Sequence, residues 1–198
     1  MVKPNFVHPS PAPGVGGGGY ALFVGRLSPE KGVSTLLKAW RNAQSRLALK
    51  IVGDGPCQEL VESGAAQNPS IHYLHRCSSD DVFDLLRNAD FLIFPSEWYE
   101  GMPRVVIESF AVGTPVLASN IGATATMVTN GETGIHFRPG DPDDLCQKVE
   151  WCSQNLDKLA AMRTHARAAF LEKYTGQGNI DSLIGAYRNA QEMPRALR

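Results

Sequence analysis

Two glutamates, Glu100 and Glu108, stand eight positions apart where an apolar stretch gives way to a polar loop and a helical pattern. The apolar stretch covers residues 91–94, and the helical pattern begins at about Pro103. Unpaired amides and the positive end of the helix dipole favour anionic and hydroxyl-bearing ligands at such a junction. We therefore expect residues 91–108 to form the centre of a ligand site.

Glu108 lies inside the apolar run 105–111, where a solvated helix face is hard to find, so its charge needs a partner. Its carboxylate can accept two hydrogen bonds from vicinal hydroxyls, as the ribose-binding acid of dinucleotide folds does. Glu100 lies before the helix, near the positive end, and would face another group of the same ligand. The alternative is that Glu100 caps the helix or is a solvated residue at its start, and that Glu108 is an exposed helical residue.

Arg26 and Lys31 flank the loop that follows the apolar strand 20–24. A helix is expected from Ser28-Pro29, because serine caps helices well and proline is tolerated at the first helical position. Lys31 then falls in the first turn, where a cation is disfavoured unless an anion lies nearby. With the helix amides, the two cations would form a phosphate site. The alternative is that both are solvated surface residues.

Other polar residues leave their alternatives open. Ser96 either donates to a phosphate or closes a turn, and His75 and Arg76 either meet a base or sugar or belong to a surface loop. No metal-ligand spacing is shared by His8, His72, His136 and His165, so we expect no metal site. The chain also lacks a P-loop and a Gly-x-Gly-x-x-Gly fingerprint after a strand.

The elements that must position these residues alternate along the chain. Strands are expected at 20–24, 47–52, 71–74, 91–94, 115–118 and 135–137. Helices are expected after Ser28, at 58–66, after Ser79 or Asp80, at 103–112, 143–155, 156–174 and 179–191, with a turn or short helix near 123–128. This alternation predicts an α/β fold: a Rossmann-like, doubly wound, mostly parallel sheet of about six strands, with helices on both faces and C-terminal helices.

Ligands of such sheets bind outside the carboxyl ends of the strands. The loops at 25–31, 53–56, 75–79, 95–104 and 119–126 should therefore share one edge. Gly113 can end the 103–112 helix in the left-handed conformation.

Composition narrows the class of protein. The chain has 198 residues, 43% of them hydrophobic, and a net charge of −1, which gives no sign of nucleic acid or an anionic membrane as main partner. No apolar run approaches a membrane span, and prolines and glycines interrupt the N-terminus before a signal sequence could form. Four dispersed cysteines favour reduced, mostly buried thiols and a cytoplasmic protein.

An ordered set of motifs resembles the C-terminal domain of retaining, two-domain GT-B glycosyltransferases of the group 1 family. Residues 23–32 resemble its Gly-Arg-Leu-x-x-x-Lys-Gly loop, and residues 51–56 its Gly-x-Gly-Pro turn. Residues 89–96 with Glu100-Gly101 and Glu108 resemble its strand and Glu-x7-Glu motif. Residues 113–116, 131–134 and 139–141 complete the series, so the resemblance covers roughly residues 20–175.

The resemblance implies a donor site for a UDP-, GDP- or ADP-sugar, with no further cofactor and no catalytic metal. Arg26 and Lys31 would hold the diphosphate and Glu108 the ribose, while the loop 75–77, which includes Arg76, would border the base. The transferred sugar would lie against Glu100 and the amides of three residues: Gly101, Met102 and Pro103. Cations and helix dipoles would stabilise the departing diphosphate.

The same resemblance implies a domain division. Residues 1–19, in which Pro4-Asn5-Phe6 resembles the family's interdomain crossover, form a flexible lead-in, residues 20–175 the nucleotide-sugar-binding domain, and residues 176–198 a C-terminal helix and tail. The N-terminal domain, with its acceptor contacts, is then the missing partner, and peripheral membrane association is open for the parent protein only. We expect the isolated domain to bind donor without transferring sugar, and the apolar stripe of its last helix to be partly uncovered.

One departure from the family pattern lies after the fifth strand, where residues 122–126 replace the usual Gly-Gly-x-x-Glu. This change mildly favours a second hypothesis, a non-catalytic module that kept the fold and lost the donor. A third hypothesis is a related GT-B enzyme, such as a sugar-nucleotide epimerase or a phosphorylase. The acidic and basic residues of the donor motifs favour the glycosyltransferase.

Overall fold

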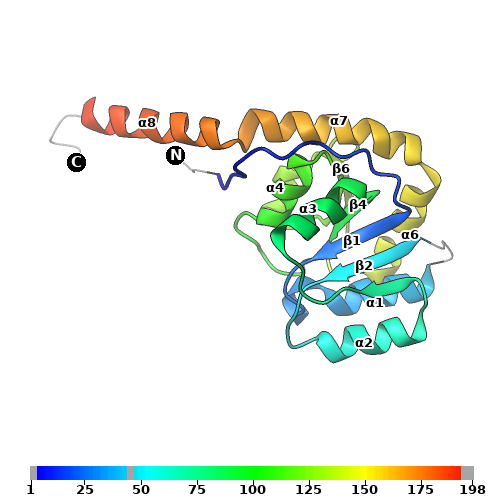
Figure 1. The fold of residues 1–198 in the computed structure, drawn as a ribbon. Helices are drawn as coiled ribbons and strands as arrows, with labels where there is room; N and C mark the ends of the chain where they lie inside the picture. The colour runs from blue at the N-terminus through cyan, green and yellow to red at the C-terminus, as the bar shows by residue number, and fades with distance from the viewer. Residues whose placement is uncertain (1–3, 44–46, 193–198) are drawn as a thin grey trace.

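The computed structural model describes residues 4–43 and 47–192 and contains one six-stranded sheet, all of whose strand pairs are parallel (Figure 1). The strand order is β3-β2-β1-β4-β5-β6. The strands are β1 (Tyr20–Val24), β2 (Ala48–Val52), β3 (Ile71–Tyr73), β4 (Phe91–Phe94), β5 (Val116–Ser119) and β6 (Gly134–Phe137). The predicted Rossmann-like α/β fold is confirmed.

Helices connect the strands and cover both faces of the sheet. They are η1 (Pro29–Lys31), α1 (Val33–Asn42), α2 (Gln58–Gln67), α3 (Ser79–Asn88), α4 (Arg104–Ala111), α5 (Thr124–Met127), α6 (Pro142–Gln154), α7 (Leu156–Lys173) and α8 (Gly176–Glu192). Side chains of α1, α2 and α6 pack in one apolar cluster, and those of α3, α4 and α5 in another. Helix α7 contributes to both clusters.

Each central strand divides its side chains between the two clusters. In β1, Ala21 and Phe23 enter the α1–α6 cluster, while Tyr20 and Leu22 enter the α3–α4 cluster. All four are nearly inaccessible. This follows from the two-residue period of a strand buried on both faces, and it explains why the sequence shows continuous apolar runs there.

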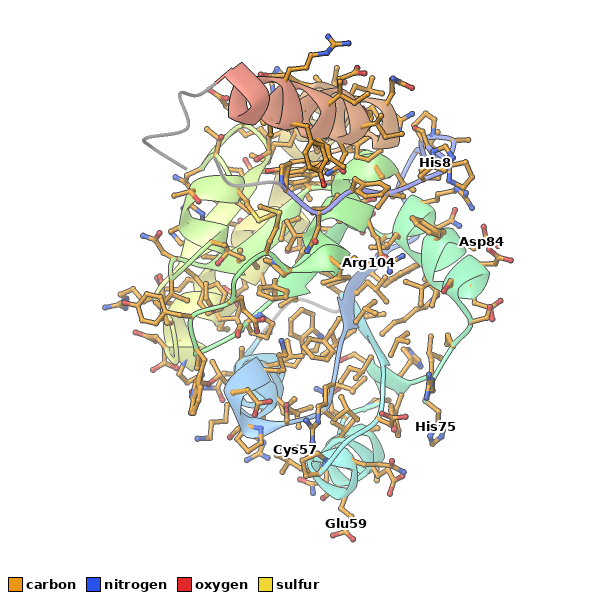
Figure 2. All side chains as sticks on the ribbon, turned by 90° about the vertical axis from the view of Figure 1, so that its left-hand side faces the viewer. His8, Cys57, Glu59, His75, Asp84 and Arg104 are labelled. Atoms are coloured by element: carbon orange, nitrogen blue, oxygen red, sulfur yellow. The ribbon has the colours of Figure 1, made fainter. Side chains whose placement is uncertain are left out.

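The sheet reverses its winding between β1 and β4, which are paired neighbours. Crevices at such a switch point are where ligands bind in open α/β sheets. Figure 2 looks toward the carboxyl ends of the strands and shows Arg104, Cys57 and His75 on that side of the molecule. Hydrogen bonds join the loops of this edge: Gly53 N donates to His75 O, and Leu27 N to Asp54 O.

The predicted helix start at Ser28-Pro29 is wrong in one respect. Pro29–Lys31 forms only a short 3₁₀ turn, and Gly32 adopts a left-handed conformation with φ 69° before α1 begins at Val33. A glycine in this conformation separates the two helical segments. Lys31 therefore ends a 3₁₀ turn and does not occupy the first turn of an α-helix.

Two helix starts also differ from the predictions. Ser78 caps α3, not Ser79 or Asp80, and it forms a capping box with Asp81. Pro103 is the N-cap of α4 and not its first helical residue. At the other end of α4, Gly113 has φ 78°, so the expected left-handed ending is confirmed.

The segment that precedes β1 lies along the α3–α4 side of the fold. Residues 4–19 run without helix and are fixed by backbone bonds such as Gly14 N to Val112 O and Gly16 N to Arg87 O. Figure 1 shows this segment following α7, and α8 extending away from the body. The expected uncovered stripe on α8 is confirmed, with exposed side chains at Ile180, Leu183, Ile184 and Tyr187. Predicted structure at residues 1–3 and 193–198 lies outside the described residues.

No helix within 4–43 and 47–192 combines the length and the apolarity that crossing a bilayer requires.

Candidate donor-binding site

A hollow of about 470 Å³ lies at the carboxyl ends of β1 and β4, and we call it the β1–β4 pocket. It is lined by residues 23–26 and Lys31, residues 94–96, and several residues between Glu100 and Glu108. Seven predicted site residues lie on its wall: Arg26, Lys31, Ser96, Glu100, Met102, Pro103 and Glu108. Two predicted residues, Arg76 and Gly101, are not among its lining residues. The sheet topology thus places side chains from distant parts of the chain around one space.

Lys31 forms an ion pair with Glu100 in this pocket, and both side chains are about three-quarters buried. The backbone explains how they meet. A Cβ atom on Gly32 would stand 1.9 Å from Pro95 O, so only glycine lets the β1 loop approach the β4 loop so closely. Lys31 also lies over the ring of Phe94, with Nζ 5.9 Å from its centre. The two loops therefore bring a cation and a carboxylate predicted from separate motifs into direct contact.

Ser96 is buried beneath this pair. Its hydroxyl lies 2.9 Å from Glu100 Oε1 and 3.1 Å from the carbonyl oxygen of Glu30. The hydroxyl has one proton to donate, so it can satisfy only one of these acceptors at a time. Ser96 fixes the carboxylate of Glu100 against the η1 turn, and a direct contact with phosphate stays a prediction.

Arg26 follows β1, and its neighbours hold the backbone on both sides. Gly25 N donates to Val52 O at 3.1 Å, and Leu27 N donates to Asp54 O at 2.7 Å. Within residues 4–43 and 47–192 the Arg26 guanidinium forms no hydrogen bond or ion pair. A guanidinium with five unused donors on a pocket wall is suited to a phosphate or carboxylate ligand.

Glu108 has a largely buried side chain, and its carboxylate pairs with Arg104. Arg104 Nε donates to Glu108 Oε1 at 2.8 Å, and the Glu108 side chain is only 16% exposed. The expectation that this charge needs a partner is confirmed. Sequence reasoning missed Arg104 itself, although its four-residue spacing from Glu108 was a visible signal. Arg104 lines the pocket at the first residue of α4, where the helix dipole disfavours a cation.

The start of α4 differs from the predicted sugar-binding amides. Pro103 has no amide hydrogen, so the expectation that it donates to a sugar is wrong. Met102 lines the pocket, but its carbonyl oxygen and sulfur accept hydrogen bonds from Asn5. Gly101 is exposed, with no atom near the position of a Cβ. Among the predicted donors, the amides of Gly101 and Met102 remain.

The loop after β3 lies on the same edge but outside the pocket wall. His75 adopts a left-handed conformation with φ 57°, uncommon for a residue other than glycine, and its ring lies 4.1 Å from that of Tyr73. Arg76 is exposed. Figure 2 shows the His75 side chain at this edge, on the far side of the strands from α4. Whether this loop borders a base stays a prediction.

The altered loop at 122–126 packs directly behind Glu100. Ala123 N approaches Glu100 O at 3.4 Å, and Gly122 has φ 57°. A Cβ atom on Gly122 would stand 3.2 Å from both Glu100 N and Tyr99 Cα. The loop therefore supports the backbone of the β4–α4 loop.

Displaced pKa values occur on two of the loops at this edge of the sheet. The pKa of Glu30 is lowered, chiefly by a 2.5 Å hydrogen bond from the Ser28 hydroxyl, with smaller contributions from its own backbone amide and the charges of Arg26 and Lys31. Burial raises the pKa of the Cys77 thiol, and the charge of Asp81 adds to this. The first effect favours the ionised form of Glu30, and the second favours the protonated thiol of Cys77.

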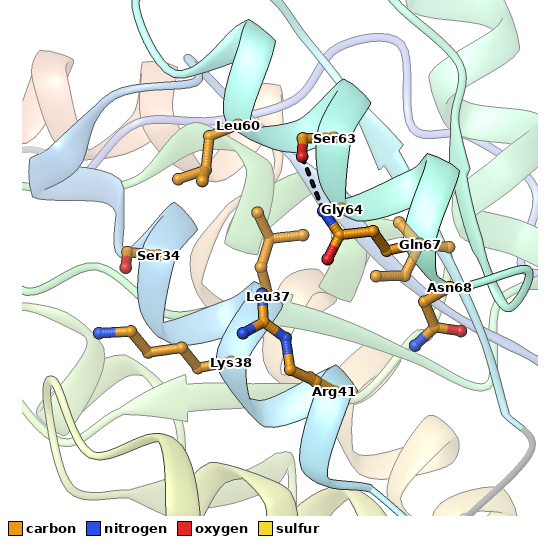
Figure 3. A pocket seen from close by; sticks show the side chains of 10 residues that line it. Ser34, Leu37, Lys38, Arg41, Leu60, Ser63, Gly64, Gln67 and Asn68 are labelled. Carbon is orange, nitrogen blue, oxygen red and sulfur yellow. Dashed lines mark hydrogen bonds between the residues drawn. The ribbon is translucent and has the colours of Figure 1, made fainter.

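Another hollow, of about 300 Å³, lies between α1 and α2 on the α1–α6 side (Figure 3). Leu37, Leu60 and Ile71 form its apolar part, and Lys38 and Arg41 stand at its side. None of the predicted site residues lines it.

In the part of the chain that the structure describes, no group of three His, Cys, Asp or Glu side chains could hold a metal ion.

Comparisons with known proteins agree with this geometry. The chain is 33% identical over 132 residues to an uncharacterized glycosyltransferase of Methanocaldococcus jannaschii, covering 66% of this chain and 37% of that protein. It is 34% identical over 154 residues to the glycogen synthase of Mycobacterium tuberculosis, covering 75% and 36%. The chain thus spans little more than a third of these relatives. The fold matches that of Anabaena HepE, solved in complex with UDP, with a TM-score of 0.79, 20% identity, and coverage of 87% and 49%.

Residues 13–169, most of the chain, match the family described as "Glycosyl transferases group 1". This range contains both the β1 and β4 loops and every pocket residue from Phe23 to Glu108. The chain therefore belongs to the group 1 glycosyltransferases.

Proposed function

We propose that the β1–β4 pocket binds a nucleotide-diphosphate sugar, and that residues 20–175 are the donor-binding domain of a retaining glycosyltransferase. The observation that carries the proposal is the convergence of Arg26, Lys31, Glu100 and Glu108 on one hollow at the switch point of the sheet. Cations suited to a diphosphate and carboxylates suited to sugar hydroxyls line the same wall. The complex of HepE with UDP, a protein of the same fold, supports this choice of ligand.

Each group has one role in the proposed complex. Arg26 and Lys31 bind the diphosphate, Glu108 accepts hydrogen bonds from the ribose hydroxyls, and Glu100 faces the transferred sugar. The diphosphate competes with Glu100 for Lys31, since the two form an ion pair in the protein alone. Arg104 pairs with Glu108 at the start of α4 and adds a third cation to the wall.

The proposed chemistry is electrostatic. As the bond between the anomeric carbon and the diphosphate oxygen breaks, both electrons pass to the diphosphate, and the acceptor hydroxyl oxygen bonds the carbon on the same face. The hydroxyl proton goes to the leaving phosphate or to water. Arg26 and Lys31, which extend from loops with hydrogen-bonded and closely packed backbones, stabilise the growing negative charge.

The proposal also covers acceptor binding, sugar transfer and the cellular compartment. The matches cover only 37% and 36% of the two relatives, so we expect regions of the parent protein outside these matches to supply part of the acceptor contacts. We expect the isolated domain to bind donor and to transfer sugar negligibly. Four free thiols support a reducing compartment such as the cytoplasm.

Calorimetric titrations with UDP, GDP and ADP, and with one sugar conjugate of each, test the proposal. We expect at least one nucleotide family to bind, and binding to weaken in Arg26→Ala. Lys38→Ala, which removes a cation from the α1–α2 hollow instead, is the matched control and should leave the affinity unchanged. A folded sample that binds none of the six ligands contradicts the proposal.

A non-catalytic module and a related GT-B enzyme such as an epimerase remain the competing functions. The change at residues 122–126 is the observation that favours the module, since it alters a loop touching Glu100. The titrations separate a module that lost its donor from a glycosyltransferase or an epimerase, because the last two bind sugar nucleotides.

A further inference from the structure

Two large aromatic side chains stand uncovered on the loop that leads into Glu100. Trp98 and Tyr99 are 68% and 84% exposed, and they directly precede Glu100 on the β4–α4 loop. Exposed apolar surface of this kind often marks a binding site, and the same loop supplies Ser96 and Glu100 to the β1–β4 pocket. Neither ring has a role in the donor contacts described above.

The backbone under the two rings is fixed on both sides. Before them, Glu97 N donates to Glu30 O at 2.9 Å, and Glu97 Oε1 accepts from the Thr35 hydroxyl at 2.6 Å. After them, the carbonyl oxygen of Glu100 faces Ala123 N at 3.4 Å. The rings therefore project from a loop tied to η1, α1 and the 122–126 loop, and a ligand need not order that loop to use them.

The charge around the rings narrows the ligand class. Glu97 and Glu100 flank the pair in sequence, and the Glu97 carboxylate bonds a neutral hydroxyl, leaving its charge without a cation among the described residues. This setting disfavours a phosphate headgroup or an anionic membrane. A neutral sugar ring fits better, because the C–H bonds of its flat face pack on an aromatic ring while its hydroxyls remain hydrated or bond to carboxylates.

We propose that Trp98 and Tyr99 form a stacking platform for a sugar ring of the acceptor, so that the acceptor of this glycosyltransferase is a saccharide. The inference rests on the proposed donor site, because the acceptor hydroxyl must reach the sugar held at Glu100. It goes further by assigning acceptor recognition to residues of this domain.

Saturation-transfer NMR with the whole chain tests the platform in the presence of UDP. The probes are the methyl pyranosides of glucose, mannose, galactose and N-acetylglucosamine. We expect transfer to the ring C–H protons of at least one probe. Trp98→Ala should reduce it about fivefold, while Trp98→Phe, which keeps an aromatic ring, should retain most of it. Tyr187→Ala removes a similarly exposed aromatic from α8 and should change nothing.

Each outcome bears on one claim. A chain that binds UDP but shows no transfer to any probe, or undiminished transfer in the Trp98→Ala, Tyr99→Ala double variant, overturns the platform and leaves the donor site standing. A chain that binds no nucleotide contradicts the proposed function instead. Trp98-dependent binding of phosphatidylglycerol vesicles, without transfer to the sugars, would assign the pair to a membrane surface and also overturn the proposal.

Discussion

At the scale of single residues, the Lys31–Glu100 ion pair is the feature with the most direct functional consequence. The same lysine is proposed to bind the diphosphate, so the carboxylate is both its partner in the free protein and a competitor of the ligand. The buried hydroxyl of Ser96 donates a hydrogen bond to the Glu100 carboxylate and holds it in place. Donor binding must therefore exchange one partner of Lys31 for another.

Glu100→Gln tests this exchange. The variant keeps the shape of the side chain but removes the charge that competes for Lys31, so we expect UDP to bind more tightly, on the order of fivefold. The extra affinity that a UDP-sugar shows over UDP should shrink, because the carboxylate facing the sugar is gone. Paired calorimetric titrations measure both effects. Weaker binding of UDP by the variant would show that Glu100 does not restrain Lys31.

Glu108→Ala tests the ribose contact. Removing a charged hydrogen-bond acceptor should weaken binding of UDP by about 10- to 100-fold. The loss should nearly vanish for 2′-deoxyuridine diphosphate, which has one hydroxyl fewer to bind. Lys38→Ala, which changes a side chain of the α1–α2 hollow, serves as the control and should leave the affinity for both nucleotides unchanged. Equal losses with ribose and deoxyribose nucleotides contradict the assigned role.

At the scale of elements, the helix starts show where sequence patterns reach their limit. The sequence predicted the approximate place of the helices that cover the sheet. Ser78, Ser79 and Asp80 are all acceptable caps, however, and only the structure shows that Ser78 Oγ accepts from Asp81 N at 3.2 Å. The η1 turn was missed for a related reason. Ser28-Pro29 is a helix start in either case, and the left-handed Gly32 that interrupts it is fixed by tertiary contact with Pro95.

Ser78→Ala and Ser79→Ala form a matched pair for the α3 cap. Loss of the capping box in Ser78→Ala should lower the free energy of unfolding by about 1 kcal/mol. Ser79→Ala changes an exposed residue inside the helix and should stay within about 0.5 kcal/mol of the unmodified chain. Urea unfolding followed by circular dichroism measures both. A larger loss in Ser79→Ala than in Ser78→Ala would contradict the cap.

At the scale of the whole molecule, Asp90 links the lead-in to the sheet. The residue is 7% exposed, and its carboxylate accepts from Gly17 N at 3.0 Å. Burial raises its pKa, although backbone donors and the nearby Arg163 partly oppose the shift. A carboxyl whose pKa is raised by folding is most favourable to the folded state below its unfolded pKa, and its contribution falls as the pH rises through the folded pKa.

Asp90→Asn tests this link through pH. Asparagine can still accept from Gly17 but carries no charge, so it avoids the burial penalty that the carboxylate meets above its pKa. We expect the melting temperature of the variant, relative to the unmodified chain, to rise as the pH increases from about 3.5 to 7. Thermal unfolding across this range measures the difference. A pH-independent difference would show that Asp90 keeps its ordinary pKa.

The sequence predicted the sheet, its parallel strands and the segments that meet at its edge, because buried strands and loop motifs are local signals. Partners set by three-dimensional packing were harder to infer. The Arg104 partner of Glu108 left a spacing signal, whereas the contact of Gly32 with Pro95 and the path of residues 4–19 along α7 depend on segments far apart in the chain. The lack of an amide hydrogen on Pro103 could have been inferred directly from its residue type.

The central claim is that a nucleoside diphosphate binds in the β1–β4 pocket, and amide chemical-shift mapping tests it most directly. The nucleotide that binds in the calorimetric screen would be added to ¹⁵N-labelled protein. We predict that the largest shifts fall in residues 25–31 and 95–108, with little change at residues 34–41 and 63–68 around the α1–α2 hollow. Shifts concentrated in the α1–α2 hollow, with residues 25–31 and 95–108 unchanged, would contradict the claim.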